Sequence, residues 1–325
     1  MSMISLIIPT CGRLGSIRRL LADLSAVGYF GRSDMEIIVV DNNRSPSDAL
    51  FSSVRSAGAL YVYQPRRGQA AALNKGIRVA AGSLIAFCDD DIRVNDPMWI
   101  DRLSSHFKDP KIGYVAGNVL AHELVTKAQR LWEKKGGLSK GILMRRFDRD
   151  FFMRFSFRGP PLRFIATGAN CMIPRSILFE VGGYDERFGV GSKVGHSQSY
   201  EMCYKIIRAD YDAVYEPSAV VTHHHPETVS GLRGRMFRYG VGDTAVQFHF
   251  LLTYGDLRGL FEAFGARHFH LSANLIRSLM GRYPMPASTV IASLAGSMLG
   301  PVIYTYATIE AFFARTRHGQ ETRFS

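Results

Sequence analysis

Short apolar runs alternate with amphipathic segments over the first 120 residues. Continuous apolar runs predict buried strands at residues 4–9, 36–40, 60–63 and 84–88. Apolar residues spaced by three or four positions predict helices between them at residues 13–27, 47–57 and 69–81. Strands that alternate with helices favour an α/β fold with a mostly parallel, doubly wound sheet covered by helices on both faces.

The second half of the chain is less regular. Residues 113–119, 163–167, 170–173, 213–215 and 219–222 predict strands. Helices are predicted around Trp132, from Pro174 onward and at residues 199–210. From about residue 230 the sequence becomes rich in helical patterns, aromatic residues and arginines.

The segment at residues 287–307 carries no charge and is as long as a membrane span. Small polar residues such as Ser293, Ser297 and Thr305 favour a buried or interfacial helix over a span. Arginines such as Arg277 and Arg282 flank the segment and would suit peripheral contact with an anionic membrane.

The composition is that of a globular protein, with 46% hydrophobic and 21% charged residues. The formal net charge of +12 favours anionic partners, but no nucleic-acid-reading element is present. The cysteines Cys11, Cys88, Cys171 and Cys203 form no CxxC pair, which argues against zinc-ribbon and thioredoxin-like sites. The N-terminal apolar run has no preceding basic segment, so we expect a first strand and a cytoplasmic location.

Polar residues directly follow three of the predicted strands, namely Thr10, Asp41 and the triplet Asp89–Asp90–Asp91. Open α/β sheets bind ligands at the carboxyl ends of their strands. Three adjacent carboxylates repel one another, so a partly buried triplet favours a bound Mg²⁺ or Mn²⁺. The alternative interpretation is a solvated acidic turn.

Other polar features leave two interpretations open. Asp41 either accepts hydrogen bonds from a nucleoside or forms an Asx turn. His223 and His225 follow a late strand and share one side of an extended segment, so they are either metal ligands or surface residues. The glycine-rich residues 189–195 match no phosphate-binding motif and are more typical of a substrate-covering loop.

The order of the motifs resembles the family 2 inverting glycosyltransferases with the GT-A fold. The resemblance covers residues 4–250 and rests on motifs at residues 7–10, 39–43, 67–76, 87–91, 167–170, 182–188 and 215–225. It implies a GT-A domain at residues 1–228, with a nucleotide-sugar half up to about residue 120 and an acceptor half after it. Residues 229–325 would form a helical region that associates with the membrane.

The resemblance also implies roles for individual residues. Those expected to bind the nucleotide-sugar are Pro9, Thr10, Arg13, Asp41, Arg67, Asn74, Lys75, Asp89 and Asp90. Those expected to bind the acceptor are Gly168, Asn170 and Tyr184. Asp91, His223 and His225 would bind Mn²⁺ or Mg²⁺.

One departure from the family pattern concerns the general base. Members of this family usually carry Glu-Asp where this chain has Gln198 and Ser199, and that Asp is the base. Serine is not a base at neutral pH, so Glu201, His196 or Asp185 takes the role, or catalysis is impaired. Glu201 has an alternative role as the i,i+4 ion-pair partner of Lys205.

We therefore expect transfer of a sugar from a UDP- or dTDP-sugar to a saccharide or lipid-linked acceptor, in surface polysaccharide or glycolipid synthesis. The location would be the cytoplasm or the inner face of the cell membrane. One alternative is a catalytically impaired relative that binds a nucleotide-sugar or a partner protein. Another is a nucleotidyltransferase, although residues 10–15 are a poor triphosphate-binding loop.

Overall fold

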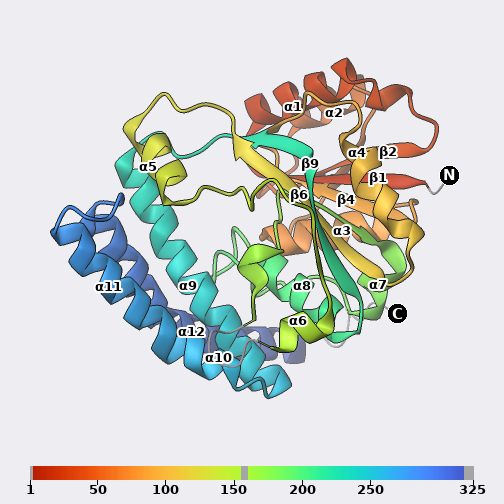
Figure 1. The fold of residues 1–325 in the computed structure, drawn as a ribbon. Helices are drawn as coiled ribbons and strands as arrows, with labels where there is room; N and C mark the ends of the chain where they lie inside the picture. Colours follow the sequence, from red (N-terminus) through yellow and green to blue (C-terminus); the bar gives the residue numbers. More distant parts are fainter. Residues whose placement is uncertain (1–2, 155–159, 318–325) are drawn as a thin grey trace.

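One mixed β-sheet forms the centre of the molecule (Figure 1). The computed structural model describes residues 3–154 and 160–317, with side chains up to residue 314. Within these residues the sheet has nine strands in the order β3-β2-β1-β4-β8-β6-β9-β5, and β7 pairs with β9. The strands are β1 (Ile4–Thr10), β2 (Met35–Asp41), β3 (Leu60–Tyr63), β4 (Leu84–Cys88), β5 (Ile92–Arg93), β6 (Ile112–Ala121), β7 (Arg145–Phe147), β8 (Asn170–Pro174) and β9 (Asp212–His223).

Helices surround the sheet and form a separate group at the end of the chain. The α-helices are α1 (Leu14–Ala26), α2 (Asp48–Ser56), α3 (Gln69–Val79), α4 (Trp99–Ser104), α5 (Lys127–Lys135), α6 (Arg149–Met153), α7 (Arg175–Glu180), α8 (Gln198–Arg208), α9 (Val229–Tyr254), α10 (Arg258–Phe261), α11 (Arg267–Leu279) and α12 (Ala287–Arg317). Short helical turns of other types are η1 (Tyr29–Gly31), η2 (Ser105–Lys108), η3 (Leu162–Phe164) and η4 (Glu262–Ala266).

Both faces of the sheet are buried, which explains its continuous apolar strands. Leu6 and Ile8 of β1 pack with α1, α2 and α4 in one core cluster. Ile7 packs on the other face with α3, α7 and α8. Strands β1 to β4 pair in parallel, whereas β8 runs antiparallel between β4 and β6. The expected α/β class is confirmed, but the sheet is mixed: it is parallel over β1 to β4, and β5, β7 and β8 pair antiparallel.

The prediction of a strand at residues 163–167 is wrong. The chain there forms the 3₁₀ turn η3, Leu162–Phe164. The carbonyls of Pro160 and Pro161 accept hydrogen bonds from the amides of Leu162 and Phe164 at 2.8 and 3.0 Å. Two prolines remove the backbone donors that a strand ladder needs, so a tight turn is favoured.

The two strands predicted at residues 213–215 and 219–222 are one strand, β9. Its parallel register with β6 shifts between Gly117 and Asn118, whose partners are Glu216 and Val220. The shift leaves Pro217 outside the ladder, where its missing N–H costs nothing. A bulge therefore accommodates the proline that looked like a strand end in the sequence.

The long helices α9 and α12 pack against each other through small residues. A Cβ atom added to Gly296 would overlap the carbonyl of Phe237, and one added to Gly240 would overlap the carbonyl of Ser293. The Thr244 hydroxyl also donates a hydrogen bond to a carbonyl of α12 at 2.8 Å. The small polar residues of α12 thus form its packing face, as small residues do where helix backbones approach closely.

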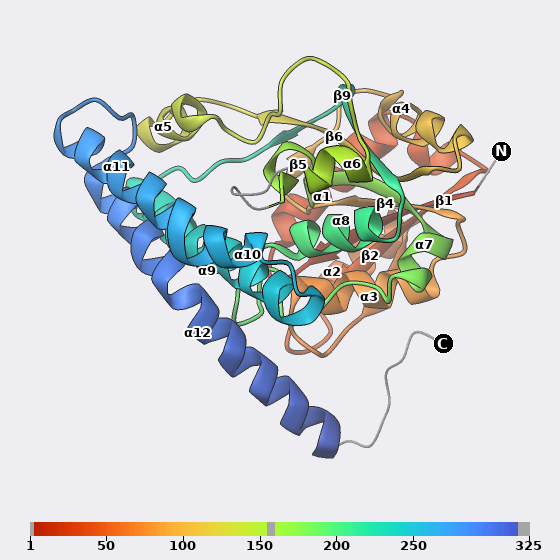
Figure 2. The same cartoon turned by 60° about the horizontal axis from the view of Figure 1, so that its bottom comes forward.

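The opposite face of the helical group exposes large apolar side chains. On α12 these include Met298, Val302, Ile309 and Phe312, and α11 adds Phe269, which is 80% exposed. The described chain contains one helix, Ala287–Ala314, whose length and apolar character would suffice to cross a membrane, and 44% of its most apolar window is buried. Figure 2 shows α12 extending beyond the rest of the molecule.

We predict that Gly296→Val destabilises the protein by about 1–3 kcal/mol, because its side chain would push α12 away from the α9 backbone. Urea unfolding followed by tryptophan fluorescence would measure the effect. Met298→Val, at a position of the same helix that is 65% exposed, is the control and should change stability by less than about 0.5 kcal/mol. Equal stability of the two variants would contradict the packing described here.

Candidate active site

The polar strand ends singled out in the sequence lie together at one edge of the sheet. Thr10 and Asp41 are partners in the parallel ladder of β1 and β2, and Asp89 follows β4 on the other side of β1. His223 ends β9 and is the antiparallel partner of Ile92 in β5. This pairing places His223 beside the acidic triplet that precedes Ile92.

Arg13 and Thr10 hold the second aspartate of the triplet. Asp90 accepts hydrogen bonds from Thr10 Oγ1 at 2.6 Å and from Arg13 Nη1 at 3.0 Å. Arg13 also donates to Asp91 at 2.6 Å. Burial raises the pKa of Asp90, and the hydrogen bond from Thr10 and the charge of Arg13 oppose that shift. Asp90 therefore anchors the loop that starts α1 to the acidic triplet.

The other two aspartates and His223 form a group that fits a metal ion. One ligand atom from each of Asp89, Asp91 and His223 lies within 4.8 Å of the others. His223 Nε2 is 3.2 Å from Asp91 Oδ1, and His223 Nδ1 is buried without a hydrogen-bond partner among the described residues. Crowded carboxylate and imidazole ligands in a partly buried site suit a divalent cation such as Mn²⁺.

The electrostatics of this group follow from burial and crowding. Burial and the negative charge of Asp91 raise the pKa of Asp89 to about 6. Burial also disfavours the charged form of Asp91, but the hydrogen bond and charge of His223 lower its pKa overall. The site thus keeps one carboxylate ionised next to another that resists ionisation, and a bound cation would relieve this conflict.

His225 lies near His223 but contacts a different element. The two imidazole centroids are 5.7 Å apart. His225 Nε2 is 2.8 Å from Oε1 of Glu133 on α5, and its side chain is fully buried. Burial lowers the pKa of His225 to about 4, so it is neutral near pH 7. His225 therefore connects α5 to the edge of the site. It does not belong to the group formed by Asp89, Asp91 and His223.

A cavity of about 550 Å³ lies beside the acidic triplet. Arg13 and Arg67, both expected to bind nucleotide, are among its walls. Its other walls are formed by residues that were not expected individually as site residues, although Asn43 lies in the motif at residues 39–43; they are Cys11, Gly12, Leu14, Asn43, Arg44, Ser45, Pro46, Ser47 and Leu50. Their signal in the sequence was their position, because they occupy the loops that follow β1 and β2 and the first turns of α1 and α2.

Asp41 does not line this cavity but holds one of its walls in place. Its side chain is fully buried. The carboxylate accepts hydrogen bonds from the amides of Asn43 and Ser47 at 2.9 and 3.1 Å and from the Tyr61 hydroxyl at 2.6 Å. Pro9 is likewise buried within β1. These contacts fix the loop at residues 43–47, which forms one wall of the cavity.

Asn74 connects α3 to a distant loop. Its side chain donates to the carbonyl of Tyr184 at 2.8 Å and accepts from the Tyr184 amide at 2.8 Å. It also donates to Glu186 at 3.1 Å. Neither Asn74 nor the half-buried Lys75 lines the 550 Å³ cavity. Asn74 therefore orders the loop after α7.

Of the three residues expected at the acceptor, Gly168 lies beside the first turn of α8. A Cβ atom on Gly168 would be in van der Waals contact with Ser199 at 3.7 Å. Asn170 is fully buried and bonds to Trp99 and to two carbonyls of neighbouring strands. Tyr184 is buried with its ring edge-on to Phe87. Asn170 and Tyr184 thus act here as supports of the sheet and the loop.

Two glutamines connect the start of α8 to the acidic triplet. Gln198 Nε2 donates to Gln69 Oε1 at 2.8 Å, and Gln69 Nε2 donates to Asp89 Oδ1 at 2.8 Å. Gln69 begins α3, directly after Gly68, whose φ of 128° strongly favours glycine. Neither glutamine was expected from the sequence to be a site residue. Gln69 was part of a quoted motif, but its contact depends on α3 and β4 being adjacent.

The catalytic candidates Glu201 and Asp185 lie together on the other side of α8. Glu201 is 1% exposed and pairs with Lys205 at 3.0 Å. Asp185 pairs with Arg187, and ligand atoms of Asp185, Glu201 and His249 lie within 4.8 Å of one another. Burial raises the pKa of Glu201 to about 7. The i,i+4 pair expected as the alternative role of Glu201 is present.

Sequence comparisons give this geometry a context. Residues 5–182 match the family model described as glycosyl transferase family 2. The pre-mycofactocin glycosyltransferase of Mycobacterium tuberculosis is 23% identical over 240 residues, which are 73% of this chain and 46% of that protein. The glucosyl-dolichyl phosphate glucuronosyltransferase of Haloferax volcanii is 25% identical over 195 residues, 58% of each chain. The chain spans about half the length of these curated relatives.

A solved structure gives the fold. The mannosyltransferase PcManGT from Pyrobaculum calidifontis, in complex with GDP-Man and Mn²⁺, superposes with a TM-score of 0.56 at 19% identity. The superposition covers 98% of this chain and 88% of that chain. The expected GT-A architecture with a helical C-terminal region is confirmed.

The buried carboxyl of Glu201 gives a pH-dependent prediction. An unfolded Glu loses its proton near pH 4.5, whereas folded Glu201 keeps its proton up to about pH 7. Between these values the folded state binds more protons, so this group makes the free energy of unfolding fall as the pH rises. Glu201→Gln removes that contribution. We expect the stability of the variant relative to wild type to increase by about 2–3 kcal/mol between pH 4.5 and 7.

Urea unfolding at a series of pH values would measure this difference. Glu227→Gln is the control, because Glu227 is exposed and its variant should differ from wild type by the same amount at every pH. A pH-independent difference for Glu201→Gln would show that Glu201 is ionised in the folded protein near pH 5.

Proposed function

Because the chain belongs to glycosyltransferase family 2 and is a glycosyltransferase, we propose that it transfers a sugar from a UDP- or dTDP-sugar with inversion at the anomeric carbon. The acceptor is a saccharide or a lipid-linked molecule in surface polysaccharide or glycolipid synthesis. The observation that carries the proposal is the group of Asp89, Asp91 and His223 beside the 550 Å³ cavity. Arg13 joins the two, because it lines the cavity and bonds to Asp91.

The cavity suits the nucleoside diphosphate of the donor. Arg13 and Arg67 supply positive charge on its walls, and the loop at residues 43–47 supplies polar groups for the base and ribose. Asp89, Asp91 and His223 would hold Mn²⁺ or Mg²⁺. Such an ion supplies Lewis-acid stabilisation of the negative charge that develops on the leaving diphosphate.

A base must accept the proton of the acceptor hydroxyl, and Ser199 stands where the family usually has a carboxylate. For this role we propose Asp243 of α9 in preference to Glu201. Asp243 lines a second cavity that the neighbour of Ser199, Tyr200, also lines, and its side chain is 21% exposed. Both carboxylates have a basic partner, Arg267 for Asp243 and Lys205 for Glu201, but Glu201 is enclosed by the protein, so it cannot meet an acceptor without a rearrangement.

We also propose that the helical group docks on the inner face of the cell membrane. The packed face of α12 is occupied by α9, and its opposite face presents large apolar side chains to solvent. Exposed Arg277 and Arg282 lie next to Leu279 and Met280 at the end of α11. Apolar side chains beside exposed arginines suit the interface of an anionic membrane.

Calorimetric titration of UDP, dTDP and GDP into the protein, with and without Mn²⁺, tests the donor site. We expect binding of UDP or dTDP that needs Mn²⁺ and weakens by about tenfold or more in Asp91→Asn and His223→Gln, because each removes a ligand of the ion. His225→Gln is the matched control and should bind the nucleotide almost as tightly as wild type, because His225 Nε2 contacts Glu133 and not the proposed metal ligands.

The outcomes separate the donor and the chemistry. Binding of GDP alone would contradict the UDP or dTDP assignment. Metal-dependent nucleotide binding without release of nucleotide from any sugar donor would favour the catalytically impaired alternative, for which the Gln198–Gln69–Asp89 chain is the specific structural observation.

The choice of base gives a separate prediction. Asp243→Asn should lower kcat by about 100-fold or more while nucleotide affinity stays near wild type, because the amide cannot accept the proton. Glu201→Gln should retain most of the turnover at pH 7. The opposite result, loss of turnover in Glu201→Gln alone, would assign the base to Glu201.

A further inference from the structure

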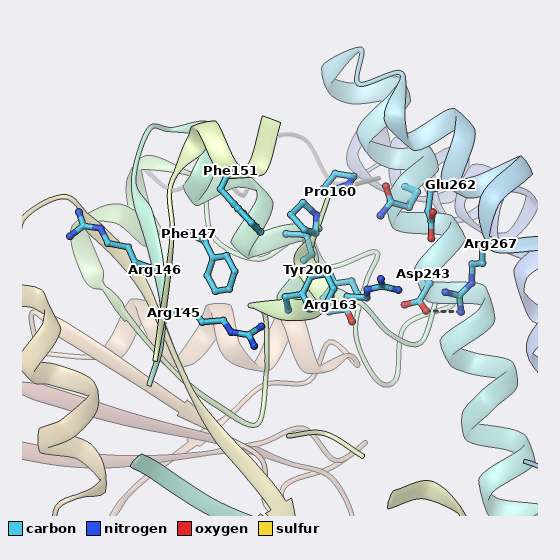
Figure 3. A pocket seen from close by; sticks show the side chains of 14 residues that line it. Arg145, Arg146, Phe147, Phe151, Pro160, Arg163, Tyr200, Asp243, Glu262 and Arg267 are labelled. Carbon is cyan, nitrogen blue, oxygen red and sulfur yellow. Dashed lines mark ion pairs between the residues drawn. The ribbon is translucent and has the colours of Figure 1, made fainter. Parts of the chain in front are cut away.

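A second cavity, of about 590 Å³, lies between the sheet and the C-terminal helices. Its walls come from β7, η3 and α8 on one side and from α9, η4 and α11 on the other. Figure 3 shows Arg145, Phe147 and Tyr200 facing Asp243 and Arg267 across this space. The cavity is separate from the 550 Å³ donor cavity, because the two share no lining residue.

Among the described residues, two cationic groups of the cavity form no ion pair, although the carboxylates of Asp243 and Glu262 also line it. Arg146 is paired with Asp109 and Asp212, and Figure 3 shows its side chain pointing away from the other labelled residues. Asp243 pairs with Arg267 at 2.7 Å. Among the described residues, Arg145 and Arg163 form no ion pair. Two unpaired guanidinium groups in one concave site favour an anionic ligand, and phosphate is the group that arginine forks match best.

Apolar surface lies beside these arginines. Phe147, Phe164 and Tyr200 line the same cavity, together with Pro160 and Pro161. The guanidinium of Arg163 lies over the Phe164 ring at 4.7 Å, which restricts its orientation. A ligand that fills the cavity therefore meets both fixed positive charge and apolar walls, the combination that an amphiphilic anion needs.

The cavity also adjoins the apolar outer surface of the helical group. Glu262 and Arg267, which line it, belong to η4 and α11. In the same stretch, Phe261, Phe264 and Phe269 are 48%, 53% and 80% exposed. An amphiphile whose head group enters the cavity would thus have its chain next to the surface that we place at the membrane.

We propose that this cavity binds the phosphate and the first apolar units of a lipid-linked acceptor, whose attacking hydroxyl belongs to the sugar that the phosphate carries. The hydroxyl oxygen bonds to the anomeric carbon of the donor, its proton passes to Asp243, and the nucleoside diphosphate leaves. The inference rests on the proposed glycosyltransferase function and names the acceptor class. Arg145 and Arg163 bind the phosphate oxygens, and Phe147, Phe164 and Tyr200 contact the adjoining carbons. Arg267 keeps Asp243 in place through their ion pair.

The position of the cavity connects this acceptor to the donor. Tyr200 directly follows Ser199, which lies beside Gly168 at the end of the chain Gln198–Gln69–Asp89. Close packing of α9 on His196 at Gly242 keeps Asp243 beside the start of α8. An acceptor held in the cavity therefore reaches the donor across the first turn of α8.

Calorimetric titration of the full chain with farnesyl phosphate tests the proposal, with farnesol and inorganic phosphate as the two halves of the probe. We expect farnesyl phosphate to bind far more tightly than either half. Arg145→Ala/Arg163→Ala should weaken its binding by about tenfold or more, because two charged hydrogen-bonding groups are lost. Arg149→Ala is the control, since Arg149 is exposed and lies outside the cavity.

Each outcome decides a part of the proposal. Equal affinity of the double variant and wild type would overturn the assignment of the cavity. Farnesol binding as tightly as farnesyl phosphate would overturn the role of the phosphate, and inorganic phosphate binding as tightly would overturn the role of the lipid. Arg145→Lys/Arg163→Lys keeps the charge and should recover part of the affinity, which a merely destabilised protein would not.

The donor site is measured independently in the same variants. Binding of UDP with Mn²⁺ to Arg145→Ala/Arg163→Ala should equal that of wild type, which also shows that the variant is folded. If wild type bound farnesyl phosphate but no nucleotide, the proposed donor chemistry would fail while the cavity assignment stood. If nucleotide bound and farnesyl phosphate did not, only the acceptor class would fail.

Discussion

The pairing of Ile92 with His223 is the contact on which the candidate site depends. Asp89, Asp90 and Asp91 stand at the carboxyl end of β4, where their mutual repulsion and burial disfavour full ionisation. The short strand β5 brings the imidazole of His223 to Asp91, and Arg13 approaches from the start of α1. His223 and Arg13 stabilise the negative charge of the triplet. Asp89, Asp91 and His223 together form the group that fits a divalent cation.

The helical region contributes to the site by forming one wall of the 590 Å³ cavity. Close packing of α12 on α9 leaves no room for side chains at Gly240 and Gly296, so the two backbones hold a fixed spacing. That spacing places Asp243 and Arg267 opposite η3 and α8. The same packing turns the large apolar residues of α12 outward. One helix contact therefore determines both the second cavity and the surface proposed for the membrane.

The departure at Gln198 and Ser199 changes how the start of α8 interacts with the donor side. An amide at Gln198 donates to Gln69, which in turn donates to Asp89. A carboxylate at that position would add negative charge to a region where the pKa of Asp89 is already raised. Moving the base to a helix outside the sheet, as proposed for Asp243, would keep a carboxylate near the acceptor without adding to this repulsion.

Local patterns in the sequence were sufficient for the strands β1 to β4 and the helices α1 to α3, for the acidic triplet at a sheet edge and for the family, but not for the short elements β5 and α4 that follow the triplet. Burial on both faces makes strands continuously apolar, and parallel strands bring their polar carboxyl ends to one edge, so these features are readable one segment at a time. The bulge in β9 was missed because Pro217 interrupts the strand signal, whereas the apolar run after Pro160 and Pro161 was taken for a strand although it begins with the 3₁₀ turn η3.

Only the tertiary structure decided which polar residues face the cavities and which support them. Asp41 and Asn170 have the residue types of binding groups, yet buried backbone amides and carbonyls engage both. Asp243 and Arg163 carry no binding-site signal in the sequence, and Gln69 belongs to a motif that does not predict its contact, because these contacts come from elements far apart along the chain. A sequence shows the chemistry that each side chain offers, whereas hydrogen-bond partners and access to solvent arise only when distant segments pack together.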